Sequence, residues 1–135
     1  ADGWLASSVT PNEVAAGIEA IHAHAAEIGR EIPDDHYGVL VPFCFATNAE
    51  EALNIAGQSI RRRQDISPSE YSALGTPEQV RQRLKEYVNA GATKFVMRPY
   101  GPKETHADQV RLLAKEVIPA LQTPFSEAER ENRSR

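Results

Sequence analysis

Apolar runs and helix starts alternate along this chain of 135 residues, and this alternation restricts the fold more than any other feature. Strands are expected at 3–6, 37–45 and 93–97, where the sequence reads GWLA, YGVLVPFCF and TKFVM. The last two runs are continuous, which is typical of strands that are covered on both faces of a parallel sheet. Strands that alternate with helices form parallel sheets with right-handed crossovers. The sequence therefore predicts an α/β fold built from parallel βα units.

The helix starts carry the reciprocal capping pattern, in which a threonine is followed three residues later by an acid or an amide. The segments are TPNE at 10–13, TNAE at 47–50, TPEQ at 76–79 and THAD at 105–108. The aspartate makes the last segment the weakest match. The apolar residues expected to face the core are Val14, Ile18, Ile21, Ala25 and Ile28, then Ala52, Ile55, Ala56 and Ile60, then Val80, Leu84 and Val88, and finally Val110, Leu113, Val117 and Leu121.

Two segments fit this scheme less well. Pro42 interrupts the second strand, and because proline cannot donate to a β-ladder, an edge or a bulge is expected there. The segment 64–75 has turn residues and no strand signal, so it is expected to be a loop that can include one short helical turn, either a lid or a long connection. Three strands make a small sheet with two open edges, and a closed eightfold barrel needs about 250 residues. The chain is therefore expected to associate or to be part of a longer protein.

Composition and charge argue against several classes of protein. The net charge of −4 comes from 15 basic and 19 acidic residues spread along the chain, so no surface for nucleic acid is expected. No signal peptide and no stretch of membrane-spanning length is evident, which favours a cytoplasmic protein. The lone Cys44 is interpreted as a small buried hydrophobe rather than a nucleophile. The basic run 61–63 is interpreted as the solvated end of the second helix.

Four motifs occur in an order that resembles the luciferase-like monooxygenase family, the flavin- or deazaflavin-dependent (β/α)8 barrel oxidoreductases. They are Asp-Gly-Trp at 2–4, Thr-Pro-x-Glu at 10–13, Gly-Thr-Pro-Glu-Gln-Val at 75–80 and Ala-Gly-Ala…Phe-Val-x-Arg at 90–98. Each motif alone is weak, but the four in register cover the chain from Asp2 to about Leu121. The form GATKFVMRP at 91–99 resembles a subgroup that uses the deazaflavin coenzyme F420, with FMN as the alternative.

The resemblance implies that residues 1–121 form the C-terminal part of such a barrel, about strands six to eight, and that 122–135 is a charged, disordered tail. The first five strands, with most loops that hold the cofactor, would precede Ala1. The resemblance further implies a fragment that is inactive alone, taken from an oxidoreductase with a small organic substrate. Two other classes remain open, namely a non-catalytic half-barrel that pairs with a second copy through its exposed sheet edges, and a small protein that binds a deazaflavin or another acidic ligand.

In such barrels the working face lies at the carboxyl ends of the strands. Arg98 is expected at the end of the last strand, where a guanidinium can hold a phosphate or a carboxylate; the alternative is a structural ion pair. Ser7 and Tyr100 are expected near the same edge as hydrogen-bonding residues, or as ordinary loop residues. Trp4 is expected either against a flavin-like ring or in the core. The spacing of the histidines matches no metal motif, so no metal site is expected.

Overall fold

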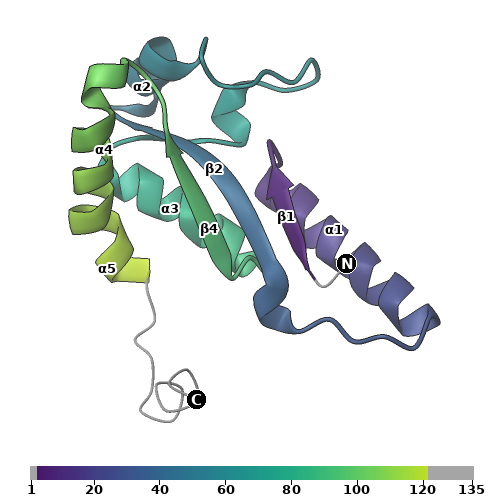
Figure 1. The fold of residues 1–135 in the computed structure, drawn as a ribbon. Helices are drawn as coiled ribbons and strands as arrows, with labels where there is room; N and C mark the ends of the chain where they lie inside the picture. Colours follow the sequence, from purple (N-terminus) through teal and green to yellow (C-terminus); the bar gives the residue numbers. More distant parts are fainter. Residues whose placement is uncertain (1–2, 122–135) are drawn as a thin grey trace.

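The computed structural model describes residues 3–121 and contains one parallel sheet (Figure 1). Its strands are β1 (Trp4–Ser7), β2 (Tyr37–Phe45), β3 (Ala73–Gly75) and β4 (Lys94–Pro99). β2 is central: β4 pairs with one of its edges, and β1 and β3 pair one after the other with the opposite edge. The parallel α/β fold expected from the sequence is confirmed, whereas Asp2 and the tail 122–135 lie outside the described residues.

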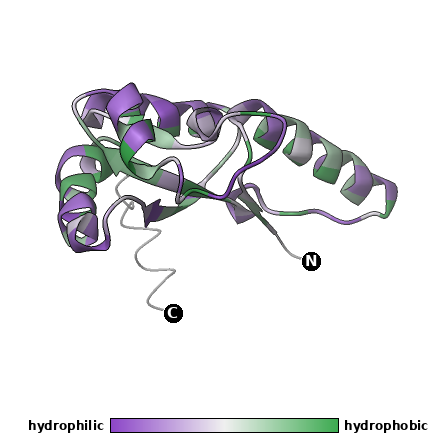
Figure 2. Cartoon of the chain, turned by 90° about the horizontal axis from the view of Figure 1, so that it is seen from above, coloured by the Kyte–Doolittle hydropathy of each residue, from purple (hydrophilic) through white to green (hydrophobic). Residues whose placement is uncertain are grey.

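Most of the helices lie on one face of this sheet, and one packs against the carboxyl end of the other face. The helices are α1 (Pro11–Glu27), α2 (Ala49–Ala56), α3 (Pro77–Asn89), α4 (His106–Leu112) and α5 (Ile118–Leu121), with a π-helical turn at Leu113–Val117 and 3-10 turns at Asp34–His36, Pro68–Glu70 and Lys103–Thr105. α1 and α3 lie behind the strands in Figure 1, and Figure 2 shows the same layering from above. Within the described part of the chain, no helix is both long enough and apolar enough to cross a membrane.

Two of the expected caps are present as complete capping boxes. The backbone N–H of Thr10 donates to Glu13 Oε1 at 2.9 Å, and that of Glu13 donates to Thr10 Oγ1 at 3.2 Å. Thr76 and Gln79 exchange the same two bonds, again at 2.9 and 3.2 Å. Each box pairs backbone groups that the first helical turn leaves free, so local sequence alone determines where α1 and α3 begin.

The other two expected caps are wrong. α2 is capped by Asn48, whose side chain accepts from the backbone N–H of Glu51, so the helix starts one residue later than the Thr47 pattern indicated. Asn is as good a cap as Thr, and only the tertiary position of the chain decides between neighbours. Thr105 has helical φ and ψ and makes no cap bond. Its hydroxyl instead donates to the carbonyl of Pro102 at 2.6 Å, inside the preceding 3-10 turn.

The main core lies between the sheet and the helices. Its buried members are Val14, Val39, Val41, Phe43, Phe45, Ala73, Val80, Leu84, Tyr87, Ala92, Leu113 and Val117. Tyr87 takes the place expected for Val88, which is 45% exposed, and Val110 is also exposed at 46%. The second helix ends at Ala56 rather than near residue 62, so these stripes were predicted correctly in part.

Pro42 lies neither at an edge nor in a bulge, which corrects the expectation. β2 pairs without interruption with β4 from Gly38 to Phe43. The carbonyl of Phe43 accepts from Tyr100 of the β4 side, whereas the N–H of Ala46 donates toward β3. Backbone groups of successive residues point to alternate sides, so Pro42 faces the β1/β3 side. There the pairing with β1 ends at Leu40 and the pairing with β3 begins at Phe43. The missing N–H therefore falls in a gap between two partners.

The segment 64–75 ends in a strand that the sequence did not indicate. β3 has only three residues, all buried, and its Leu74 pairs with Cys44 of β2. A run this short has no periodicity to detect, and its conformation follows from pairing with β2. The expectation of a loop through residue 75 is therefore wrong at its C-terminal end.

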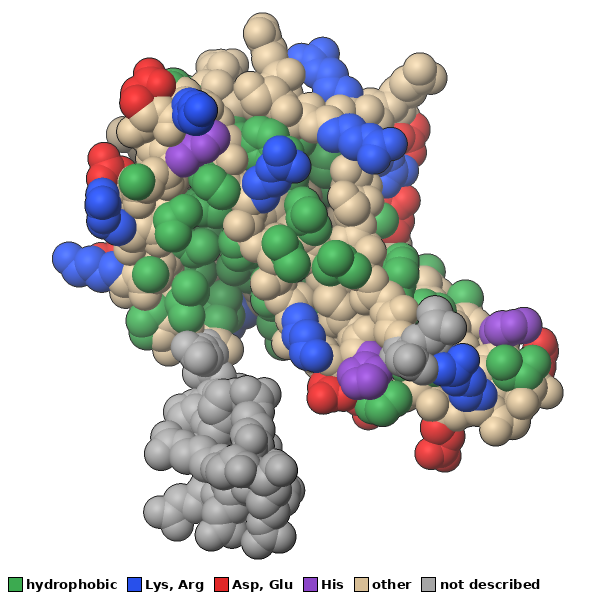
Figure 3. Space-filling view, viewed as in Figure 1, with side chains coloured by type: hydrophobic (Ala, Val, Ile, Leu, Met, Phe, Trp, Pro, Cys, Tyr) green, Lys and Arg blue, Asp and Glu red, His purple; other side chains and the backbone are tan. Residues whose placement is uncertain are grey.

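One face of the sheet carries a helix only at its carboxyl end, where α2 packs with Cys44 of β2 and Leu74 of β3. This differs from the expectation that the strands at 37–45 and 93–97 are covered on both faces. Along β4, exposed residues alternate with partly buried ones, whereas β2 is buried almost throughout. Leu5 of β1 and Val96 of β4 are 57% and 48% exposed. Figure 3 shows apolar side chains gathered on this face, which we call the open face. The open face is defined by Leu5, Ser7, Gly38, Leu40, Val96 and Arg98.

Candidate functional site

Arg98 lies at the carboxyl end of β4, beside Pro42 of β2, on the open face. Its Cζ atom is 5.4 Å from the centroid of the Tyr100 ring, a cation–π contact. The side chain is exposed, and among the described residues it forms no ion pair with a carboxylate. The alternative expectation, a structural ion pair at Arg98, is therefore not met among the described residues. The guanidinium keeps its fork of N–H donors for a phosphate or carboxylate.

Tyr100, whose ring contacts the Arg98 guanidinium, is itself held in place by two interactions. Its backbone N–H donates to the carbonyl of Phe43 at 3.0 Å, which extends the pairing of β4 with β2 by one residue. Its ring is partly buried against a second apolar cluster whose buried members are Cys44, Ala52, Ala56, Ile60, Tyr71 and Leu74. The ring is therefore anchored on one side and carries the guanidinium on the other.

Ser7 lies on the same open face, at the carboxyl end of β1. It pairs with Leu40, and Leu40 pairs with Val96, so Ser7 and Arg98 are two strands apart and displaced by two residues along the strand. Strand spacings of about 4.8 Å and a rise of about 3.3 Å per residue place their Cα atoms about 12 Å apart. One ligand of cofactor size can span this distance, so the structure brings these two predicted residues to one edge.

Trp4 lies on the opposite face. It pairs with Tyr37 at the start of β1, and both side chains point toward the helices. A Cβ atom added at Gly17 of α1 would be 2.4 Å from the Trp4 ring, which shows how closely the indole lies against that helix. The absence of a side chain at Gly17 makes room for the ring. The structure therefore separates Trp4 from Ser7, Arg98 and Tyr100.

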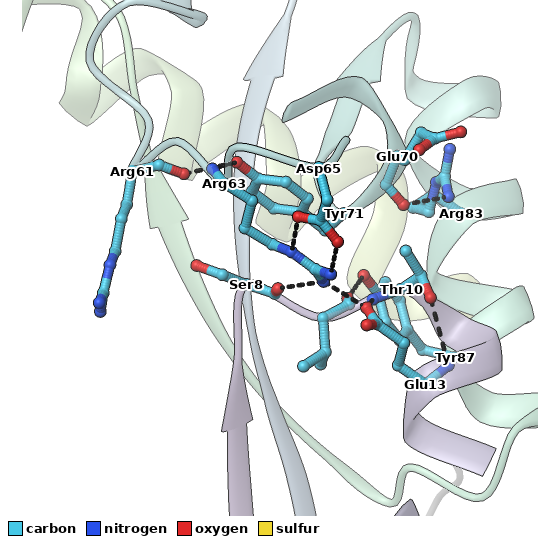
Figure 4. A network of polar contacts seen from close by, with 11 residues as sticks. Ser8, Thr10, Glu13, Arg61, Arg63, Asp65, Glu70, Tyr71, Arg83 and Tyr87 are labelled. Atoms are coloured by element: carbon cyan, nitrogen blue, oxygen red, sulfur yellow. Dashed lines mark hydrogen bonds and ion pairs between the residues drawn. The ribbon is translucent and has the colours of Figure 1, made fainter. Parts of the chain in front are cut away.

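Arg63 forms an ion-pair network that the sequence did not indicate. Its guanidinium binds Asp65 through Nε at 2.9 Å and through Nη2, and it also contacts Glu13 and the carbonyl of Ser8 (Figure 4). α2 has already ended at Ala56, so the expectation that 61–63 is a solvated helix end is wrong. Asp65 is a local signal, but no pattern connects residues 63 and 13, which are 50 positions apart.

The network perturbs the acids it contains. The hydrogen bond from Arg63 holds the pKa of Glu13 below its usual range, and the capping bond from the Thr10 backbone acts in the same direction. The guanidinium likewise lowers the pKa of Asp65, and the two carboxylates together raise the pKa of Arg63. All three groups are therefore charged at neutral pH.

Cys44 belongs to the apolar cluster that holds the Tyr100 ring, and the histidines make separate contacts. Cys44 is fully buried, and burial raises the pKa of its thiol, which disfavours the thiolate a nucleophile needs. His106 Nε2 lies 3.0 Å from the carbonyl of Gly101, and His22 lies 3.9 Å from Asp34 and beside the Tyr37 ring. Within residues 3–121, no three His, Cys, Asp or Glu side chains gather in a way that could hold a metal ion.

Comparison of the sequence with models of protein families, and with curated proteins, gives no match. Comparison of the structure with solved structures gives several matches. An F420-dependent secondary alcohol dehydrogenase in complex with an F420–acetone adduct matches with a TM-score of 0.63 and 19% identity over 90% of this chain. Monooxygenase RslO1 from Streptomyces bottropensis matches with a TM-score of 0.66 and 16% identity over 89%. The coenzyme F420-dependent tetrahydromethanopterin reductase from Methanopyrus kandleri matches with a TM-score of 0.65 and 20% identity over 90%.

These matches cover 43%, 42% and 46% of the three neighbours, so the chain spans less than half of the length of each. At such identities the likeness establishes the fold. All three neighbours are members of the luciferase-like family, the family that the sequence motifs resemble. The structural likeness agrees with the resemblance at the level of the fold: this chain has the parallel α/β fold of part of these three proteins.

Proposed function

We propose that this chain is part of a luciferase-like oxidoreductase that uses coenzyme F420, with FMN as the alternative. The observation that carries the proposal is Arg98, an exposed guanidinium at the carboxyl edge of the open face that the described carboxylates do not pair. Two of the three structural neighbours named above depend on F420, which favours the deazaflavin. The bound cofactor would supply the hydride chemistry, and a small organic substrate would exchange that hydride with it.

The residues at this edge fit an anionic cofactor. The N–H groups of Arg98 would hold a phosphate or carboxylate group. The hydroxyl of Ser7, whose Cα atom lies about 12 Å from that of Arg98 along the same edge, would donate to another oxygen of the same cofactor. The cation–π contact with Tyr100 restricts the position of the Arg98 guanidinium at the carboxyl edge of the open face. The position of Trp4 on the helix-covered face argues against a role in holding the ring, so we assign Trp4 to the core.

The chain supplies only one wall of such a site. We propose that its strands correspond to about strands six to eight of the barrel, and that the remaining strands cover Leu5, Leu40 and Val96. A flavin-like ring needs walls on both faces to exclude water during hydride transfer. The isolated chain is therefore expected to bind F420 weakly and to be inactive, and turnover by the 135-residue chain alone would contradict this part of the proposal.

The test is a fluorescence titration of F420 into the chain and into two variants. Arg98→Ala removes the proposed anchor and is expected to weaken binding at least tenfold, since a charged hydrogen bond contributes about 1.5–3 kcal/mol. Arg111→Ala makes the same change of charge on α4, where Arg111 pairs with Asp108 at 2.6 Å, and is expected to leave affinity unchanged. Equal losses of affinity in both variants would show that Arg98 acts only through the net charge of the chain and would contradict its role as an anchor. Unchanged affinity in Arg98→Ala, or no binding by the chain, would refute the proposal.

A second candidate is a non-catalytic half-barrel that pairs with a copy of itself. The exposed Leu5 and Val96 favour it, because apolar side chains on an uncovered face promote association. Light scattering of the chain and of Val96→Glu tests it. A dimer that becomes monomeric in the variant supports pairing through the open face. A monomeric wild-type chain at micromolar concentration would exclude this candidate.

A further inference from the structure

Arg63 connects two regions that are far apart in the sequence and adjacent in space. From the loop after α2, its Nη1 donates to the carbonyl of Ser8 at 3.2 Å and pairs with Glu13 of α1. Its Nε and Nη2 hold Asp65 in a fork geometry, which restricts the guanidinium in its plane. Figure 4 shows the side chain between the two regions. One side chain thus joins the turn after β1 to the segment 57–72.

The turn after β1 has a conformation that requires support. Ser8 has φ = 57°, in the left-handed region that non-glycine residues seldom adopt. Its carbonyl accepts from Arg63, and the next carbonyl, that of Val9, accepts from the hydroxyl of Tyr87. Two side chains from distant segments therefore hold two successive carbonyls. Because Ser7 directly precedes this turn, the turn determines the position of Ser7 at the carboxyl edge of the open face.

The segment 57–72 is anchored by the buried side chains of Ile60 and Tyr71, but the stretch 61–65 has no buried side chain. Arg61, Arg62 and Gln64 are exposed, and a hollow of about 430 Å³ lies between the end of α2 and this segment. The backbone N–H of Arg63 donates to the Tyr71 hydroxyl at 3.2 Å, and that hydroxyl donates to the carbonyl of Arg61. These polar contacts fix the backbone around residue 63, so the guanidinium is presented to the turn in a defined position.

We propose that Arg63 is a positioning residue, which couples the segment 57–72 to the Ser8 turn so that the two form one wall beside the carboxyl end of β1. Without the guanidinium, Glu13 and Asp65 would face each other as two unneutralised carboxylates, so the segments would separate rather than merely lose a bond. That this wall borders a ligand rests on the proposed function. The coupling itself does not, and it can be measured without any ligand.

The test is hydrogen exchange of the full chain, followed at two amides. The Thr10 amide donates to Glu13 and reports on the turn, and the Arg63 amide reports on the segment. Arg63→Ala is expected to accelerate exchange at both positions by about tenfold, because both open when the coupling is lost. Arg63→Lys keeps the charge but loses the fork, and should give an intermediate acceleration at both.

Arg83→Ala is the matched control. Arg83 donates to the carbonyls of Glu70 and Ser69, so it anchors the same segment to α3, whereas none of its hydrogen bonds reaches the turn. It is expected to accelerate exchange near residues 69–71 and to leave the Thr10 amide unchanged. If Arg63→Ala behaves in the same way, with a faster segment and an unchanged Thr10 amide, the coupling is refuted. Acceleration at Thr10 in both variants would also refute it, because it would reflect a general loss of stability.

Glu13→Gln covers the case in which Arg63→Ala does not fold. The amide oxygen can still accept from the Thr10 backbone, whereas the ion pair with Arg63 is lost, so a smaller acceleration at both reporters is expected. No change at the Arg63 amide would refute the coupling. An F420 titration of the same variants separates the two proposals: absence of binding by the wild-type chain contradicts the proposed function, whereas the exchange data still decide the role of Arg63.

Discussion

Gly75 is the position where a single methyl group should be most costly. It ends β3 with φ = 118°, in the region that favours glycine. A Cβ atom there would lie 2.0 Å from Gln79 Oε1 and 3.0 Å from the backbone nitrogen of Ala49. Gln79 Oε1 is the acceptor for the Thr76 N–H in the capping box of α3. Gly75→Ala would therefore strain the backbone and displace a capping residue at the same time.

The two costs can be estimated separately. A left-handed residue with a side chain costs about 1–2 kcal/mol. Loss of a capping interaction costs about 0.5–2 kcal/mol. We expect the free energy of unfolding to fall by the sum of the two, about 1.5–4 kcal/mol. Gly29→Ala is the matched control, since Gly29 has φ = 70° and no atom within 4 Å of an added Cβ. That variant should carry the backbone cost alone, about 1 kcal/mol.

Urea denaturation measures the difference. With an m-value of about 1.5 kcal/mol per molar, Gly75→Ala should lower the midpoint by about 1–2.7 M and Gly29→Ala by about 0.7 M. Unchanged m-values would show that both variants act on stability rather than on compactness. Equal shifts would refute the reasoning, because the displacement of Gln79 would then contribute nothing.

Two further predictions follow from the caps and from the ion-pair network. Thr76→Ala should lower the free energy of unfolding by about 1 kcal/mol, whereas Thr105→Ala, which removes no cap bond, should change it by a few tenths in the same urea experiment. The pKa values of Glu13 and Asp65 are lowered on folding, so their stabilising contribution is present at neutral pH and is lost as the pH falls below about 4. Urea midpoints at pH 7 and 3.5 should therefore differ less in Arg63→Ala than in the wild type; an equal pH dependence would contradict this.

The parts of the fold that the sequence predicts are those that local rules decide. The boxes at Thr10 and Thr76 satisfy their own backbone groups within one turn, and the continuous apolar run 37–45 forms the central strand, which is buried along almost its whole length. β3 escaped prediction because pairing with β2, and not its own three residues, makes it a strand. Pro42 misled for the same reason, since the gap between β1 and β3 cannot be seen in β2 alone.

The site divides in the same way. The placement of Arg98 and Ser7 at one edge was predictable because each ends an apolar run, and the ends of parallel strands meet at one edge. The side to which Trp4 points depends on a register that its short strand does not specify. Arg63 was misinterpreted because its partners, Ser8 and Glu13, lie more than 49 positions away. Contacts of that kind belong to the folded chain and leave no local pattern.

Binding of the proposed anion at Arg98 and covering of the open face by a partner are expected to be coupled. Leu5 and Val96 remain more than two-fifths exposed on the face that carries Arg98. Any partner that buries them also removes water around the guanidinium, and the attraction between Arg98 and an anion grows as the local dielectric constant falls. Ligand affinity and covering of the face are then thermodynamically linked, so each must strengthen the other by the same factor. A covering segment or second copy that raises F420 affinity would be the natural partner of this face, and one that leaves affinity unchanged would not.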